Sequence, residues 1–354
     1  MTTVLSPDEK KKNLEAVWRL EDTDEVPFVI EIGPFHGATK KFFDDPRAEV
    51  EWNEALHRMR EGVYDYGLPN IKPNQGIGIV AAAFGCGYTV NDEADPWITA
   101  KIREENADDV YKLEIPDPEE NDVFRMVWKR IESLQSISSL PLRMVNVPSP
   151  LVTASMIWDY TSFIESLLIC PGQVHTLLEK VTEATIIYIR EQFRRIKNLF
   201  SVGHESSCPI PRFAGVRVSD DTAALLSPAM YREFGVKYNS IISREFGGIV
   251  VHSCGDVQYV VPAMMEIEGL KGLDFTIPQV MNREAVRNAA AGKVVLCLRQ
   301  RYWDHPKDAP VDLAEYSAGL VETFGRKGII IETSTASAEE ARALGEKLHR
   351  LLSK

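Results

Sequence analysis

The chain has 354 residues, of which 44% are hydrophobic and 26% are charged, so it can bury a sizeable core and is not intrinsically disordered. Its formal net charge of -12, without a basic tail or stripe, argues against a nucleic acid or an acidic membrane as a partner. No apolar run approaches the length of a bilayer span, the start does not resemble a signal peptide, and the five cysteines show no disulfide rhythm. We therefore expect a cytoplasmic protein with reduced thiols.

The first elements are indicated by capping residues and apolar patterns. Ser6 is a good N-cap and Pro7 suits a first helical position, which predicts a helix to about Leu20. A strand is expected over residues 27–32, and an amphipathic helix over residues 45–61. This order predicts a helical extension that precedes the first strand.

Between about residues 62 and 116 the periodicity weakens. We interpret this stretch as an excursion that covers one end of the fold. Its Gly76-x-Gly78 sequence is not a phosphate-binding loop, because neither the third glycine nor a following helix is present.

From Leu140 onward, apolar strand patterns alternate with helical ones. The expected strands cover residues 142–147, 199–205, 216–219, 249–254, 273–276, 294–298 and 329–333. The expected helices cover residues 171–196, 227–245, 257–268, 283–291, 313–324 and 338–352. With the strand at 27–32 this makes eight strands, the number that closes a (β/α)8 barrel by right-handed crossovers. We predict one TIM-barrel domain over residues 1–354.

One strand ends in a pair of residues that suit a metal. Side chains alternate along a strand, so His252 and Cys254 point the same way at the end of an apolar run. Cys297 lies in a second apolar run and supplies a third soft ligand, so we predict a zinc site made by these three residues. In the alternative interpretation, His252 is a hydrogen-bonded core residue and both cysteines are small buried hydrophobes.

Several segments resemble the uroporphyrinogen decarboxylase superfamily, and within it the zinc-dependent, corrinoid-linked methyltransferases. The similar segments are Asp95-Pro96-Trp97-Ile98, Arg217-Val218-Ser219-Asp220-Asp221, Leu226-Ser227-Pro228, His252-Ser253-Cys254-Gly255 and Gly272-Leu273-Asp274-Phe275-Thr276. The resemblance covers most of residues 20–350. It implies a single TIM barrel that moves a methyl group between a small molecule and a corrinoid cobalt on a separate protein.

The chain departs from that pattern in two places. The resembling decarboxylases carry an arginine-rich turn after the first strand, whereas residues 33–37 here contain no arginine, which argues against a polyanionic tetrapyrrole. The resembling coenzyme M methyltransferases take a cysteine ligand from the loop after the last strand, where this chain has Glu332 to Ser337. Cys297, and Glu332 beside it, would have to complete the ligand set.

The expected function is transfer of a methyl group from a small donor, best a methoxylated aromatic, to the Co(I) of a corrinoid protein. Zinc would stabilise the leaving group, and Asp221 could orient a hydroxyl or relay a proton, although Asp220 could equally cap the next turn. Phe35, His36, Phe84 and Asp220 are the expected substrate contacts, whereas Trp158 and Tyr160 are better explained as helix-core residues.

Two alternatives stay open: a methylcorrinoid:thiol methyltransferase, and a protein that binds a tetrapyrrole or corrinoid without catalysis. A homodimer is also compatible with the sequence.

Overall fold

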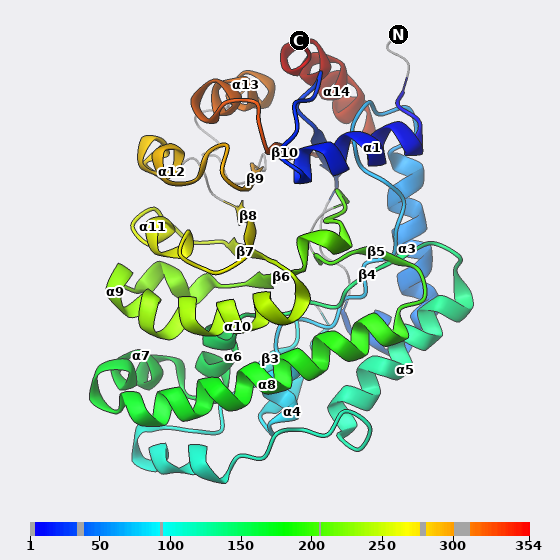
Figure 1. The fold of residues 1–354 in the computed structure, drawn as a ribbon. Coiled ribbons are helices and arrows are strands. Elements are labelled where there is room, and N and C mark those ends of the chain that lie inside the picture. The colour runs from blue at the N-terminus through cyan, green and yellow to red at the C-terminus, as the bar shows by residue number, and fades with distance from the viewer. Residues whose placement is uncertain (1–3, 34–38, 93–94, 205–206, 277–280, 301–311) are drawn as a thin grey trace.

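A six-stranded parallel sheet forms the centre of the computed structural model (Figure 1). The structure describes residues 4–33, 39–92, 95–204, 207–276, 281–300 and 312–354. In spatial order, the strands of the sheet are β1 (Phe28–Ile32), β10 (Ile329–Thr335), β9 (Val295–Arg299), β8 (Leu270–Phe275), β7 (Ile249–Ser253) and β6 (Val216–Ser219). Because every pair is parallel, the carboxyl ends of all six strands meet at one end of the molecule.

Two further strands close the ring. β4 (Leu142–Arg143) and β5 (Leu199–Ser201) form a separate parallel ladder. Backbone hydrogen bonds join this ladder to β6, from Ser219 N–H to the Val147 carbonyl at 3.0 Å and from Arg217 N–H to the Val202 carbonyl at 3.3 Å. On the other side, the ladder reaches β1 through the segment at residues 66–71, which bridges to Leu142 and bonds to Phe28. The predicted TIM-barrel fold is confirmed, with two of its strands shorter than expected.

Helices surround the strands (Figure 1). The N-terminal half holds α1 (Pro7–Trp18), α2 (Thr39–Asp44), α3 (Pro46–Met59), α4 (Ile79–Ala83), α5 (Asp122–Ile137), α6 (Pro150–Ile157), α7 (Tyr160–Ile169) and α8 (Pro171–Arg195). The C-terminal half holds α9 (Pro228–Tyr231), α10 (Lys237–Phe246), α11 (Val261–Met264), α12 (Arg283–Ala290), α13 (Leu313–Phe324) and α14 (Ala338–Leu352). Ser6 caps α1 as predicted, in a reciprocal capping box with Glu9.

Two predictions about the helices need correction, and one long helix was not predicted. The helix expected at residues 257–268 shrinks to the single turn of α11, and α5 was not predicted although Asn121 caps its start. The stretch expected as one helix at 227–245 divides into α9, a π-helical turn η4 (Arg232–Val236) and α10.

The excursion contains more order than its sequence indicated. A two-stranded antiparallel hairpin, β2 (Gly87–Thr89) and β3 (Trp97–Thr99), follows α4 and precedes the 3-10 turn η1 (Glu104–Lys112). Shorter 3-10 turns, η2 (Arg212–Ala214) and η3 (Asp221–Leu225), flank β6.

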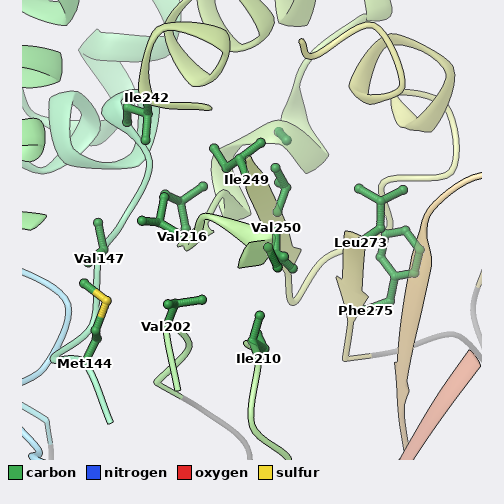
Figure 2. Packing of buried hydrophobic residues seen from close by; sticks show 14 of the residues in the cluster. Met144, Val147, Val202, Ile210, Val216, Ile242, Ile249, Val250, Leu273 and Phe275 are labelled. Atoms are coloured by element: carbon green, nitrogen blue, oxygen red, sulfur yellow. The ribbon is translucent and has the colours of Figure 1, made fainter. Parts of the chain in front are cut away.

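Apolar side chains fill the space between strands and helices. Figure 2 shows part of this core, with Val216 of β6, Ile249 and Val250 of β7 and Leu273 of β8 drawn as sticks. All four are fully buried, and each such side chain stabilises the fold by roughly 1.5–3 kcal/mol relative to an exposed position. Within the described residues, no helix is both long and apolar enough to cross a membrane.

The start of β6 depends on a close approach of two glycines. Gly215 has φ +91°, and a Cβ atom there would lie 1.8 Å from the Gly248 carbonyl oxygen. Gly247 also has a positive φ, of +77°, but a Cβ atom there would meet nothing within 4 Å. Gly247 thus has an ordinary left-handed backbone (ψ +15°) without overlap, whereas Gly215 combines a rarer backbone conformation (ψ -107°) with the overlap.

We predict that Gly215→Ala lowers the free energy of unfolding more than Gly247→Ala does. The Gly247→Ala variant should lose roughly 1–2 kcal/mol from its left-handed backbone. Gly215→Ala should lose roughly 1–3 kcal/mol beyond that, the usual cost of overpacking. Urea denaturation of both variants measures the difference, and equal losses would contradict the proposed overlap.

Candidate metal centre and barrel cavity

The inner face of the sheet carries polar side chains at one level. The register pairs Ser219 with His252, His252 with Asp274, and Asp274 with Cys297 on successive strands. Paired residues of neighbouring parallel strands point to the same side of a sheet. A row of polar groups therefore runs across four strands near their carboxyl ends.

His252, Cys254 and Asp221 form the group best suited to hold a metal among the described residues. Their ligand atoms all lie within 4.8 Å of one another. His252 Nε2 is 3.1 Å from Cys254 Sγ, and the Cys254 N–H donates to Asp221 Oδ1 at 2.6 Å. His252 is buried, whereas Cys254 is exposed, so the group is open to solvent on one side. The expected convergence of His252 and Cys254 is thus present in the structure.

A buried carboxylate contacts the Nδ1 side of the His252 ring. Asp274 Oδ2 lies 3.2 Å from His252 Nδ1, in an ion-pair contact whose angle departs from a straight hydrogen bond. Burial alone would raise the pKa of Asp274, but Arg299, His252 and Arg217 hold that pKa well below its usual range. The carboxylate stays charged and favours a proton on Nδ1, which leaves the Nε2 lone pair facing the Cys254 sulfur.

The same carboxylate raises the pKa of His252. Burial and the nearby Arg217 act to lower that pKa, but the charge of Asp274 and its contact with the ring outweigh them. A metal at Nε2 would have to displace a proton that binds more tightly than on a free imidazole.

The structure does not bring Cys297 into this group, and Asp221 takes its place. Cys297 is level with Asp274, two strands away from His252, whereas Cys254 lies beyond the end of β7. Strands are spaced about 4.8 Å apart, so the backbones of His252 and Cys297 are separated by about twice that distance. Burial, with the charge of Asp274 second, raises the pKa of the Cys297 thiol well above its usual value.

Asp220, predicted as a substrate contact, is held by hydrogen bonds from other parts of the protein. Its carboxylate accepts hydrogen bonds from Tyr231 Oη at 2.7 Å, Asn239 Nδ2 at 2.8 Å and Ser149 Oγ at 2.8 Å. Burial raises the pKa of this carboxyl group although these three donors act to lower it. Asp220 makes no side-chain cap to η3 either, so it anchors the end of β6 to α6, α9 and α10.

The other predicted contacts lie in different places. Phe84 is 5% exposed and belongs to the hydrophobic core, and Phe35 and His36 fall outside the described residues. Trp158 is fully buried as expected for a helix-core residue, but Tyr160 is 48% exposed. The core interpretation is therefore wrong for Tyr160.

Glu332 lines a polar cavity of about 210 Å³ inside the barrel. The Glu332 carboxylate lies 3.4 Å from an Arg299 guanidinium nitrogen. The lining residues are Glu31, Lys72, Asn74, Gly76, Ile77, Asp95, Asn146, His204, Arg299, Glu332 and Thr333.

Lys72, Asn74 and Arg299 also line the cavity and were not predicted as site residues. Arg299 could have been found, because it lies two residues after Cys297 on the same face of β9. Lys72 and Asn74 come from the excursion, where no periodicity marks them.

Comparisons with known proteins place the chain in a family. The family model described as uroporphyrinogen decarboxylase (URO-D) matches residues 10–200. A solved structure, "methyltransferase from Methanosarcina mazei", is similar with a TM-score of 0.71 at 16% sequence identity, covering 96% of this chain and 98% of that chain. At 16% identity, this similarity shows a shared fold only. No curated protein matches the sequence significantly. Because the family model spans more than half of the 354 residues, this chain belongs to the uroporphyrinogen decarboxylase family.

Proposed function

We propose that this protein is a methyltransferase that moves a methyl group from a small donor to the Co(I) of a corrinoid held by a separate protein. The observation that carries the proposal is the convergence of His252, Cys254 and Asp221 at the open end of the barrel. The methyltransferase from Methanosarcina mazei, which shares the fold, is consistent with it. The best donor is a methoxylated aromatic that is released as a phenol.

The side chains present fit a zinc ion. An imidazole nitrogen, a thiolate and a carboxylate are the ligand types that zinc binds, and catalytic zinc sites keep one position open. His252 and Cys254 would be ligands, and Asp221 is better placed than Cys297 to be the third. Asp221 would then bind the metal rather than relay a proton. Bound there, zinc would supply Lewis acidity that stabilises the departing oxygen.

The chain's own residues prepare this step. Asp274 holds the His252 ring in one orientation through Nδ1, so the free nitrogen faces the open side of the group. The methyl group leaves without the electrons of the C–O bond, which stay on the oxygen, and the oxygen then needs a proton. We assign the Glu332 carboxylate, in the barrel cavity beside Arg299, to accept a hydrogen bond from the polar end of the donor, while solvent at the open side of the group supplies the proton.

The arginines of the barrel do not suit a polyanionic tetrapyrrole, although the family is named for a decarboxylase. Arg217 binds Asp274, and Arg299 binds Asp274 and lies 3.4 Å from Glu332. Arg60 pairs with Asp65 and Glu31. Their charges are already balanced within the protein. We therefore favour methyl transfer over decarboxylation of a porphyrinogen.

The corrinoid belongs on a separate protein in this proposal. The sequence lacks the Asp-x-His-x-x-Gly signature of the corrinoid-binding domains that it would otherwise resemble. Among the described residues, the parallel strands form one barrel, and no second α/β domain that could hold the cofactor is present.

We predict one zinc per chain and a loss of zinc together with activity in Cys254→Ser. Cys170→Ser, at the start of α8, is the matched control and should keep both. Metal analysis of the purified variants measures this. Full zinc occupancy in Cys254→Ser would exclude the site.

A second pair of variants identifies the third ligand. Asp221→Asn should lower the zinc content, whereas Cys297→Ser should leave it unchanged, because only Asp221 lies within ligand distance of the pair. The reverse result would restore the ligand set expected from the sequence.

The donor class is tested with Co(I)-cobalamin as the acceptor. We expect a purified chain without stoichiometric corrinoid, and a cobalt absorbance change with methoxybenzenes. Reaction of methanol or a methylamine alone would overturn the aromatic donor. Methylation of a thiol by methylcobalamin, without any reaction of these donors, would favour the reverse transfer instead.

A further inference from the structure

An apolar groove lies on the outer side of the barrel cavity, between the β2–β3 hairpin and the corner of α6 and α7. Its volume is about 730 Å³, within the range of roughly 300–1,000 Å³ that small-molecule sites occupy. Trp97 is 70% exposed and Tyr160 48% exposed, and both line the groove beside Ile77 and Met156. Two aromatic rings thus face open space instead of the core.

The two walls of this groove are fixed to each other by the backbone. Lys101 N–H and Ile102 N–H donate to the Ile157 carbonyl at 2.9 and 3.0 Å, and Asp159 N–H donates to the Ile102 carbonyl at 2.8 Å. These bonds tie the segment after β3 to the end of α6 and the start of α7. The groove is therefore formed before any ligand binds, which lowers the entropic cost of binding.

The Gly76-Ile77-Gly78 sequence allows the hairpin to pack closely. A Cβ atom on Gly78 would lie 2.1 Å from Ile98 Cγ1, and one on Gly76 would lie 3.0 Å from Pro96 Cδ. Gly76 and Gly78, which do not form a phosphate-binding loop, thus allow the hairpin to pack closely against this segment. They leave Ile77 between them on the wall of the groove.

The groove and the polar cavity adjoin each other, and intermediate residues link each of them to the metal-binding group. Ile77 and Asp95 line both spaces. Ser155, on the groove wall, lies 3.4 Å from the hydroxyl of Thr222, the residue after Asp221. On the cavity side, Arg299 binds Asp274, which contacts His252.

We propose that the groove binds the aromatic ring of the methyl donor, with Trp97 and Tyr160 as ring contacts, while a polar ring substituent reaches the barrel cavity. This inference rests on the proposed function. A flat ring gains both apolar burial and favourable stacking geometry against exposed aromatic side chains.

The charges at the junction of groove and cavity, where Ile77 and Asp95 lie, favour a neutral hydrogen-bond donor such as a hydroxyl as the polar ring substituent. Three carboxylates, of Glu31, Asp95 and Glu332, line the cavity against the two cations of Lys72 and Arg299. Asp95 is exposed at the junction, where its oxygens accept a hydrogen bond and repel a second carboxylate. A methoxyphenol therefore fits better than a methoxybenzoate.

Calorimetric titration of the zinc-loaded full chain with 2-methoxyphenol tests the groove. Trp97→Ala should weaken binding about tenfold, an effect of about 1.4 kcal/mol, and Trp97→Phe should retain most of the affinity. Tyr111→Ala is the matched control, because Tyr111 is 56% exposed on η1 and does not line the groove. The neutral substituent is tested with 2-methoxybenzoate, which should bind more weakly to the wild-type chain.

The outcomes separate this inference from the proposed function. Wild-type affinity in Trp97→Ala, or an equal loss in Tyr111→Ala, would exclude the groove even if methyl transfer to Co(I)-cobalamin proceeds. A selective loss in Trp97→Ala without any methyl transfer would support the groove and refute the methyltransferase. Tighter binding of 2-methoxybenzoate than of 2-methoxyphenol would contradict the inference that the polar substituent is neutral.

Discussion

The buried carboxylate of Asp274 links four strands of this barrel. It lies on β8 and contacts His252 of β7, and it also binds Arg217 of β6 and Arg299 of β9. Burying charges costs several kcal/mol per ion, so such a network is weak evidence for a gain in stability. Its clearer effect is geometric. It fixes the imidazole ring and sets the level at which four strand ends meet.

A second carboxylate holds the neighbouring strand end by neutral donors alone. Asp220 receives hydrogen bonds from a tyrosine, a serine and an asparagine, and its own N–H bonds to the His252 carbonyl at 2.7 Å. Asp221 follows immediately, and its side chain turns to the Cys254 N–H. The two adjacent acids thus have different settings, since the buried one anchors β6 and the partly exposed one lies beside His252 and Cys254.

Local patterns predicted those features that depend on one segment at a time. Alternation along β7 was sufficient to place His252 beside Cys254, and the succession of strands and helices was sufficient for the barrel. Which side chain lies beside this pair depends on register across several strands, which no local period encodes, so Cys297 was predicted where the structure has Asp221. Trp97 stayed unrecognised because the hairpin that exposes it has strands of only three residues, and Tyr160 was assigned to a helix core although it starts α7 with its side chain exposed.

The placement of charge shows how a barrel of this family can suit a substrate other than a polyanion. Two of its buried arginines pair with Asp274 and Glu332, and a third pairs with an aspartate and a glutamate, so these cations serve the protein's own carboxylates. The polar cavity is left with more carboxylates than cations, and the adjoining groove is largely apolar. A fold fixes where a site lies, whereas the side chains fix its chemistry. Here they combine the converging side chains of His252, Cys254 and Asp221 with a polar cavity and a largely apolar groove.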